Sequence, residues 1–476
     1  MFHDAIVIGS DEDGISAAIA AANAGLDVLL VDALEVDGTP RRAPGALLLG
    51  LLHETVLEIH AAHRVLGRER SASELRALFG RVLSRRRDEG VKFHFAFLRE
   101  RLARAGVRVT SGLPRLRSPN EVEIAPGDVR RSPIIVMAVG ARARRPARFA
   151  FDHRLVCDPD SALLADAVPR SLLVIGADIV GCEFACMFAA LGCQVTVVER
   201  RRRLLRFVDA DLREILHRWM QRMGVTVVLE EEVREVRPTG SGSDEHAIVV
   251  LGSGRLEVSE RILIAAGGVP NTLHLGLERA GVASNERGFV VVDDRWRTSR
   301  PGIWATGGVV DALAPIAALG HQGRSAMLDA IGASFDAGGE IPLVIHTVPE
   351  LATVGLSQEA CEHLGLRSFA ASAPLGRGLR ARIRGEDEGI LKLVVDGETL
   401  RLLGVHVVGM GAHEIVNLGA VLMRRGVSVE DLASTIFSAG SLSAAYQSAA
   451  LEALRLSGAT RPGGSANGPG DSAGRW

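Results

Sequence analysis

Residues 171–209 read SLLVIGADIVGCEFACMFAALGCQVTVVERRRRLLRFVD. The apolar segment LLVI predicts a short buried strand, and the turn GADIVG connects it to an apolar helix that Gly192 ends. A second strand, VTVV (195–198), follows and ends in the acidic Glu199. A strand, a glycine-containing turn, a helix and a second strand, in this order, predict a βαβ unit of the dinucleotide-binding type.

The turn of this unit fits a bound dinucleotide at all but one position. Gly176 permits the tight turn, and Gly181 lets the helix pack closely on the strand. The helix N-terminus offers free N–H groups to a pyrophosphate, and Glu199 stands where a carboxylate would hold a ribose hydroxyl. The middle position is Asp178, although this position is normally glycine so that the backbone can contact the pyrophosphate.

The same unit, with the same substitution, opens the chain. Gly9 begins its turn, Gly14 stands at the position of close helix packing, and Asp32 ends its second strand. Asp11 replaces the middle glycine, and the offsets 176 − 9, 178 − 11, 181 − 14 and 199 − 32 all equal 167. Two such units in register are strong evidence for the fold and weaker evidence for the ligand.

Two interpretations of the aspartates follow from electrostatics. A carboxylate ~4 Å from a phosphate charge costs about 4 kcal/mol at an effective dielectric constant of ~20, and rotation of the side chain toward solvent reduces this to ~1 kcal/mol. An aspartate at a helix start also accepts backbone N–H bonds and contributes ~1 kcal/mol. Asp11 and Asp178 are therefore either tolerated beside a ligand or built-in substitutes for its phosphate.

Composition excludes several classes of function. A chain of 476 residues is too long for one core and suggests three domains, and a hydrophobic fraction of 47% is ample for globular packing. The formal net charge of −2 argues against nucleic acid as the main partner. We find no uninterrupted apolar run of membrane-spanning length and no basic-then-apolar leader, so we expect a cytoplasmic protein without a membrane segment.

The five cysteines do not predict a disulfide framework, because their number is odd and no leader precedes them. Cys182 and Cys186 are one helical turn apart, and we interpret them as small buried residues rather than metal ligands. No histidine with ligand spacing lies near them, so the sequence predicts no metal site. The cysteines are Cys157, Cys182, Cys186, Cys193 and Cys361.

The remaining segments predict an α/β protein with a separate C-terminal part. Residues 64–106 have the Arg, Glu and Leu spacing of a solvated pair of amphipathic helices. Residues 225–250 alternate as antiparallel strands do, and residues 341–456 combine strand patterns with two helices, near 412–425 and 441–456. The tail 457–476 is rich in Gly, Ser and Pro, which predicts disorder.

Motifs along nearly the whole chain resemble the pyridine nucleotide–disulfide oxidoreductase family, with the soluble NAD(P) transhydrogenases as the most similar branch and the dihydrolipoamide dehydrogenases next. The resemblance implies two Rossmann-like dinucleotide-binding domains, one of them split, and a C-terminal α+β dimerisation domain. The motifs are DPDS (158–161), GCEFA (181–185), GGVPN (267–271), ATG (305–307), HQGR (321–324), TVPE (347–350), VG (354–355), GVH (404–406), Gly409 and Glu414, with GRGLRAR (376–382), Phe437 and Tyr446 favouring the transhydrogenase branch.

By resemblance, residues 1–150 and 272–340 form an FAD-binding domain, residues 151–271 an NAD(P)-binding domain, and residues 341–456 a domain that pairs subunits into a homodimer or larger homo-oligomer. The implied cofactors are FAD and NAD(P), and the implied reaction passes a hydride from NADPH through FAD to NAD+. The cofactor-contacting residues expected on this basis are Gly9, Ser10, Gly14, Asp32, Gly140, Gly176, Gly181, Glu199, Arg200, Gly267 and Gly307.

Several positions depart from the family pattern. The segment after Asp32 contains no cysteine, so a redox-active disulfide is excluded, and we identify no catalytic residue. Ala46 stands where the family has a lysine, and Gly308 where its aspartate holds the flavin ribitol, with Asp311 three residues late. The acid–base pair of disulfide reductases falls on Ala439 and Ala444, although transhydrogenases also lack that histidine.

Three functions remain open on the sequence alone. The first is a transhydrogenase-type flavoprotein that tolerates the aspartates. The second is a non-catalytic relative that keeps the fold and the pairing as a scaffold or regulatory protein, and the third is an NAD(P)H sensor without FAD. The nucleotide preference is also open, because Glu199 suits the free 2′-hydroxyl of NAD while the arginines from Arg200 onward suit the 2′-phosphate of NADP.

Overall fold

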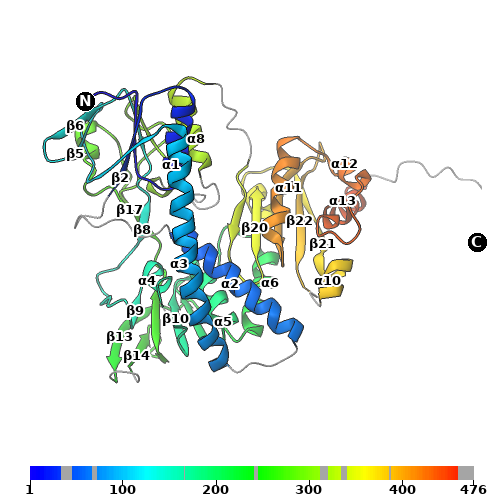
Figure 1. Cartoon of the computed structure of the whole chain (residues 1–476). Coiled ribbons are helices and arrows are strands. Elements are labelled where there is room, and N and C mark those ends of the chain that lie inside the picture. The colour runs from blue at the N-terminus through cyan, green and yellow to red at the C-terminus, as the bar shows by residue number, and fades with distance from the viewer. Residues whose placement is uncertain are drawn as a thin grey trace, which may run out of the picture.

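The structure is a computed structural model that describes residues 1–33, 45–66, 72–165, 167–240, 245–310, 320–333, 340–384 and 388–458. Three sheet-containing regions share the chain, and Figure 1 shows the C-terminal one set to one side of the other two. The predicted tail falls almost entirely outside the described residues, as does Asp311.

The first βαβ unit forms the centre of a five-stranded parallel sheet of order β18-β7-β1-β2-β3. Strand β1 is completely buried because its neighbours β7 and β2 pair with it on both edges and helices cover it. Strand β18 joins this sheet from far along the chain, by parallel pairing with β7. The elements are β1 (Ala5–Ile8), α1 (Glu12–Asn23), β2 (Val28–Ala33), β3 (Arg108–Gly112), β7 (Ile134–Met137), β18 (Ile303–Ala305) and α8 (His321–Ala330).

The second unit builds an equivalent five-stranded parallel sheet of order β12-β11-β10-β16-β9. Strand β12 pairs in parallel with β11, so the expectation that the whole of residues 225–250 is antiparallel was wrong for its first strand. The antiparallel pattern applies to the small sheet β13-β14-β15 that follows. The elements are β9 (Val156–Cys157), β10 (Ser171–Ile175), α5 (Ile179–Ala190), β11 (Gln194–Glu199), β12 (Thr226–Leu229), β13 (Val233–Thr239), β14 (His246–Leu251), β15 (Leu256–Ser259) and β16 (Arg261–Ile264).

Two helices connect the first unit with the rest of the molecule: α2 (Gly45–Leu66) and the long α3 (Ala72–Ala105). Figure 1 shows α3 running from α1 down to the region of the second sheet. Arg87 of α3 donates to the Leu164 carbonyl at 3.0 Å, and Arg76 to the Gly192 carbonyl at 3.4 Å. Most of residues 64–106 form the single helix α3, so the pair of helices expected in that range was wrong. The two hydrogen bonds attach α3 to the second unit.

Small peripheral elements complete these two regions. A three-stranded antiparallel sheet has the order β4-β5-β6, and β8 pairs with β17 in a two-stranded ribbon. The elements are β4 (Arg115–Ser118), β5 (Glu121–Ala125), β6 (Asp128–Arg131), β8 (Ala141–Ala143), α4 (Pro159–Ala162), α6 (Ala210–Arg222), β17 (Gly268–Pro270) and α7 (Leu277–Ala280).

The C-terminal region is an α+β domain, as predicted. Its five-stranded antiparallel sheet, of order β19-β20-β23-β22-β21, packs against helices, and the Tyr446 hydroxyl fixes α13 by donating to the Ile415 carbonyl at 2.7 Å. The sequence analysis missed the short helices α9, α10 and α12. The elements are β19 (Leu343–Ile345), β20 (Leu351–Gly355), α9 (Gln358–His363), β21 (Ser368–Pro374), α10 (Leu379–Arg384), β22 (Ile390–Asp396), β23 (Leu402–Val408), α11 (Ala412–Arg424), α12 (Val429–Ser434) and α13 (Ala444–Leu456).

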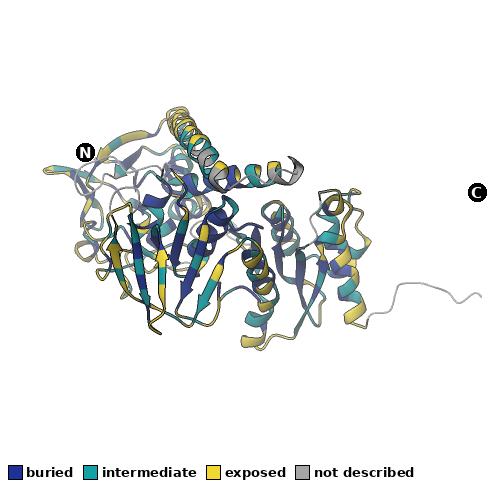
Figure 2. Cartoon of the chain, turned by 90° about the horizontal axis from the view of Figure 1, so that it is seen from below, coloured by how far each residue is buried: buried dark blue, intermediate teal, exposed yellow. Residues whose placement is uncertain are grey.

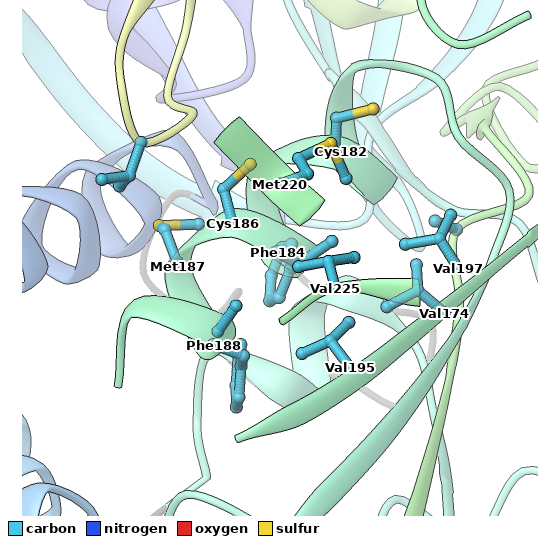
Figure 3. Packing of buried hydrophobic residues seen from close by; sticks show 14 of the residues in the cluster. Val174, Cys182, Phe184, Cys186, Met187, Phe188, Val195, Val197, Met220 and Val225 are labelled. Atoms are coloured by element: carbon cyan, nitrogen blue, oxygen red, sulfur yellow. The ribbon is translucent and has the colours of Figure 1, made fainter. Parts of the chain in front are cut away.

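One core joins the second unit to the C-terminal domain. Helix α5, apolar except for the buried Glu183, lies between its own sheet and α2. Figure 2 shows buried residues, in dark blue, along strands of the molecule. In Figure 3, Cys182, Cys186 and Phe184 of α5 pack among valines of β10 and β11. The cysteines are therefore small core residues, as predicted. The buried Lys392 adds an ionic link, because its ammonium lies 3.0 Å from the Asp209 carboxylate.

One helical segment reaches membrane-like hydropathy, contrary to the sequence expectation. The window Gly45–Ala62 of α2 is long enough to span a bilayer and has a mean hydropathy of 1.2 over 18 residues. This is weak evidence, because buried helices of soluble proteins pass the same test, and 39% of the window is buried. Leu52 and Val56 of α2 belong to the core around α5, so we interpret α2 as a core helix.

Candidate functional site

The glycines of the two turns are required by close backbone approach, as the sequence predicted. A Cβ on Gly14 would lie 2.0 Å from the Gly9 carbonyl oxygen, and one on Gly181 would lie 1.9 Å from that of Gly176. Gly9 and Gly176 themselves have φ of +110° and +106°, which L side chains rarely adopt. Both helices therefore pack against their strands in the dinucleotide-binding manner.

The first turn is closed by its own aspartate. Asp11 is the N-cap of α1, and its Oδ1 accepts the Gly14 N–H at 2.8 Å. Its Oδ2 lies 3.4 Å from the position of a Cβ on Gly307 and 3.8 Å from that of a Cβ on Gly140. The predicted built-in substitute for a phosphate is therefore present here, and it faces the two glycines expected to contact FAD.

A second carboxylate at this turn was missed by the sequence analysis. Asp13 is only 3% exposed, and its Oδ1 accepts the Gly323 N–H at the start of α8 at 3.0 Å. Its Oδ2 lies 2.9 Å from the position of a Cβ on Gly307. Burial raises the pKa of Asp13 to about 6, although backbone N–H groups of Gly323, Gly320 and Gln322 oppose the shift. The run Asp11-Glu12-Asp13 inside the turn was the available signal.

The other expected residues of the first turn also bond within the protein. The Ser10 hydroxyl donates to Asp32 Oδ1, so the ribose-type carboxylate already has a donor. The Gly307 N–H donates to Gln322 Oε1 at 2.9 Å. The structure thus brings together Gly9, Ser10, Gly14, Asp32, Gly140 and Gly307, with Asp11 and Asp13 between them.

The second turn is open where the first is closed. Asp178 is the N-cap of α5 by position, but its side chain makes no capping hydrogen bond, so the expected substitution for a phosphate was wrong here. The Asp178 side chain is 52% exposed, and its Oδ2 lies 3.7 Å from Arg201 Nη1. The backbone start of α5 therefore remains available to an anion.

Glu199 stabilises the second turn through hydrogen bonds to backbone N–H groups. Its buried carboxylate accepts the Ala177 N–H at 2.8 Å and the Arg201 N–H at 2.9 Å. These bonds hold the turn and the chain after β11 in one arrangement, which is a structural role that the sequence analysis did not foresee. Gly267, the remaining candidate, follows two residues after Ala265, whose carbonyl closely approaches Gly176.

Most of the arginines after β11 are surface ion pairs. Arg201 faces Asp178, Arg202 Nε lies 2.7 Å from Glu230, and Arg203 Nη1 lies 3.7 Å from Glu359. Arg200 is exposed, and the described residues give its guanidinium no ion pair. Arg200 is therefore the arginine of this run best placed to meet a ligand.

Family models match the chain in two consecutive parts. Residues 3–352 match the pyridine nucleotide-disulphide oxidoreductase model, and residues 341–450 match the dimerisation domain of the same family. The chain belongs to this oxidoreductase family. The resemblance and the fold class expected from the sequence are thereby confirmed. The dimerisation domain indicates a homodimer, and the family in general binds FAD and NAD(P).

Relatives in this family match nearly the full chain. The soluble pyridine nucleotide transhydrogenases of Mycobacterium bovis (strain BCG / Pasteur 1173P2) and Pseudomonas entomophila are 33% and 31% identical, over 95% of this chain and 97% and 98% of theirs. The crystal structure of LpdA from Mycobacterium tuberculosis superposes with a TM-score of 0.82 at 26% identity, covering 95% of this chain and 99% of that one. The HOCl-induced flavoprotein disulfide reductase RclA from Escherichia coli has a TM-score of 0.80 at 24% identity, covering 94% and 99%, which shows the fold alone.

The flavin of this family does not fit the first turn of this member. A diphosphate would need the Gly14 N–H that Asp11 already uses, and the space beside Gly307 that both carboxylates approach. Two negative side chains would then face a double anion. The surroundings of Gly308 also disfavour bound flavin. A Cβ at this position would lie 2.9 Å from the Ala141 nitrogen, which leaves little room for the family's aspartate.

Burial, like the sequence, argues against thiol chemistry in this member. All five cysteines are buried and free. Burial raises the pKa of Cys157, Cys186 and Cys193 to about 12, so none supplies a thiolate near pH 7.

Proposed function

We propose that this chain is a nicotinamide-nucleotide-binding protein of the oxidoreductase family that does not bind FAD. It binds NAD(P)H at the second turn, through the start of α5, and responds to the nucleotide as a sensor or regulatory partner. The observation that carries the proposal is the opposite orientation of two equivalent aspartates: Asp11 turns into its helix and Asp178 turns out to solvent.

The electrostatic cost of binding a phosphate differs between the two turns and supports this proposal. At the first turn, each carboxylate ~4 Å from a phosphate charge opposes binding by about 4 kcal/mol at an effective dielectric constant of ~20, because both are held inward. At the second turn, Asp178 is exposed and faces Arg201, so its repulsion is screened to ~1 kcal/mol or less. The diphosphate of NAD(P)H therefore meets free helix N–H groups at Gly181 and its neighbours.

Arg200 favours NADPH over NADH within this proposal. The Glu199 carboxylate is occupied by two backbone N–H groups, while Arg200 lies exposed next to it and can contact a 2′-phosphate. Gly176, Gly181 and Gly267 surround the same nucleotide, and the C-terminal domain pairs two chains into a homodimer. The relatives are named soluble, which supports a cytoplasmic location without nucleic acid or membrane as partner.

The test is a comparison of three ligands on the purified chain. We expect no flavin absorbance near 450 nm, no change in melting temperature with FAD, and a rise with NADPH that exceeds the rise with NADH. Arg200→Ala should remove the preference for NADPH, and Arg202→Ala, whose guanidinium is paired with Glu230, is the matched control. A yellow protein with one FAD per chain would overturn the proposal.

A second candidate is the transhydrogenase reaction itself, in which a hydride passes from NADPH to NAD+ by way of FAD. It is favoured by the relatives of that name, which match 95% of this chain. The assay is NADPH-dependent reduction of an NAD+ analogue by the chain as purified and after incubation with FAD. Turnover that requires FAD would establish this candidate and reject the flavin-free proposal.

A further inference from the structure

Three histidines from distant parts of the sequence meet at the junction of α2, the loop after β19 and α11. They are His53, His346 and His413, and one ring nitrogen of each lies within 4.8 Å of those of the other two. The ring centroids are 4.9, 5.3 and 4.8 Å apart. The first and last of these residues are 413 − 53 = 360 positions apart, which is why the sequence analysis found no ligand spacing.

Two rings have a nitrogen within hydrogen-bond distance of a protein acceptor, and the third has a nitrogen near a carboxylate. His53 Nε2 lies 3.2 Å from the Thr347 carbonyl oxygen, and His346 Nδ1 lies 3.1 Å from Glu183 Oε1. His413 Nδ1 lies 3.7 Å from the Glu350 carboxylate. Metal-bound histidines show this arrangement, in which a carbonyl or carboxylate fixes the ring and leaves the opposite nitrogen to the metal.

The opposite nitrogens are the unexplained part of the cluster. His53 is fully buried, and its Nδ1 has no hydrogen-bond partner among the described residues. His413 Nε2 is likewise buried and has no hydrogen-bond partner among the described residues. A buried polar atom without a partner costs ~1–3 kcal/mol, so two at one place indicate a missing ligand.

Two buried carboxylates beside the histidines also favour a bound cation. Glu183 is 1% exposed, and its Oε2 has no hydrogen-bond partner among the described residues. Glu350 is also buried, at 5% exposure. The described residues give neither carboxylate a lysine or arginine, so a divalent ion held by neutral rings would compensate their charge.

We propose that His53, His346 and His413 bind a divalent transition-metal ion, of which zinc is the best match, with Glu183 and Glu350 as the groups that orient the rings. Three imidazoles and one open position form a four-coordinate zinc site. Zn–N bonds of ~2.0–2.1 Å place the nitrogens roughly 3.3 Å apart, so binding draws the rings together by small rotations. The ion would fasten α2 to the C-terminal domain and leave one position for water.

The experiment uses the full chain stripped with a chelator and titrated with ZnCl₂ against a chromophoric competitor. We expect one zinc per chain, bound with a submicromolar Kd, and a higher melting temperature of the loaded protein. Cobalt(II) substituted at the site should give the visible absorption of four-coordinate nitrogen ligation. Copper(II), titrated in parallel, identifies the preferred ion.

Variants separate the site from adventitious binding. His346→Asn and His413→Asn should weaken zinc binding by at least 100-fold, and Glu183→Gln by roughly 10–100-fold because it removes only the orienting charge. His363→Asn, in an exposed residue of α9, should change nothing. Less than about 0.1 zinc per chain, or equal affinity in the wild type and in a folded His413→Asn or Glu183→Gln variant, would overturn the proposal.

Discussion

The two turns of this molecule carry the same substitution at the same offset and use it in opposite ways. In the first, Asp11 caps α1, and Asp13 reaches across to the start of α8. In the second, the equivalent position of Asp13 is the apolar Val180, and Arg201 draws Asp178 away from its helix. Both helices offer an equivalent N–H, that of Gly14 and that of Gly181, so the turns differ in the groups outside the helix that each aspartate meets.

The comparison extends to what each turn packs against. Helix α8 approaches α1 so closely that a Cβ on Gly323 would lie 1.8 Å from the Asp13 carbonyl oxygen. The start of α8 therefore points its N–H groups into the first turn, and a carboxylate satisfies them. Behind the second turn lies the carboxylate of Glu199, whose bonds to Ala177 and Arg201 support the turn without entering the phosphate position.

The largest expected effect is one that both turns share. Gly14→Ala and Gly181→Ala should each destabilise the protein by about 3 kcal/mol or more, because the added methyl meets a backbone carbonyl at 2.0 and 1.9 Å. Chemical denaturation measures the change. Gly50→Ala in α2, where nothing lies within 4 Å of the new methyl, is the control and should not destabilise. A tolerated Gly14→Ala would mean that the helix does not pack as described.

The pH dependence of stability should distinguish the two turns next. The pKa of Asp13 is raised from 3.8 to about 6, so its neutral form favours folding; this stability is fully present below about pH 3.8 and is lost as pH rises through 6. This rise in the pKa of Asp13 corresponds to about 3 kcal/mol. Unfolding free energies between pH 4 and 7 should fall less in Asp13→Asn than in the wild type. Asp178→Asn, at the exposed second turn, should leave the slope unchanged, and equal slopes in all three proteins would contradict the buried carboxylate.

Removal of both inward carboxylates should partly reopen the first turn. Asp11→Gly combined with Asp13→Asn takes two negative charges away from the phosphate position, and we expect the affinity for FAD to rise at least tenfold. FAD fluorescence quenching measures it. Asp178→Gly is the matched control because it removes the equivalent aspartate of the other turn, and it should not change FAD binding. An unchanged affinity in the double variant would assign the loss of flavin to other positions, such as Gly308.

The smallest difference concerns capping alone. Asp11→Ala should cost about 1 kcal/mol, because the Gly14 N–H loses its acceptor. Asp178→Ala should change the free energy of unfolding by no more than about 0.5 kcal/mol, since this side chain is exposed and caps nothing. Thermal unfolding of the two variants side by side provides the measurement. Equal losses would show that both aspartates cap in solution.

The sequence predicted the paired βαβ units correctly because their signals are local. Gly14 and Gly181 are each required by the carbonyl of the glycine that begins the same turn, and the apolar strands are recognisable from their composition. It misread β12 as antiparallel, because the side-chain pattern of a short strand does not reveal the direction of its partner. The sequence analysis considered Asp11 but overlooked Asp13. The backbone N–H groups that bond to Asp13 come from Gly320 onward, more than 300 residues later in the chain.

By itself, then, the amino-acid order determined the family, the two nucleotide-type folds and the absence of a redox disulfide, all of which depend on neighbours along the chain. Only the tertiary structure decided which aspartate closes its turn, since that depends on whether α8 or Arg201 lies beside it. It alone also brought His53, His346 and His413 together. The physical reason is the same in both cases: hydrogen bonds, charges and metal ligands act over a few ångströms of space, whatever the number of residues between the groups.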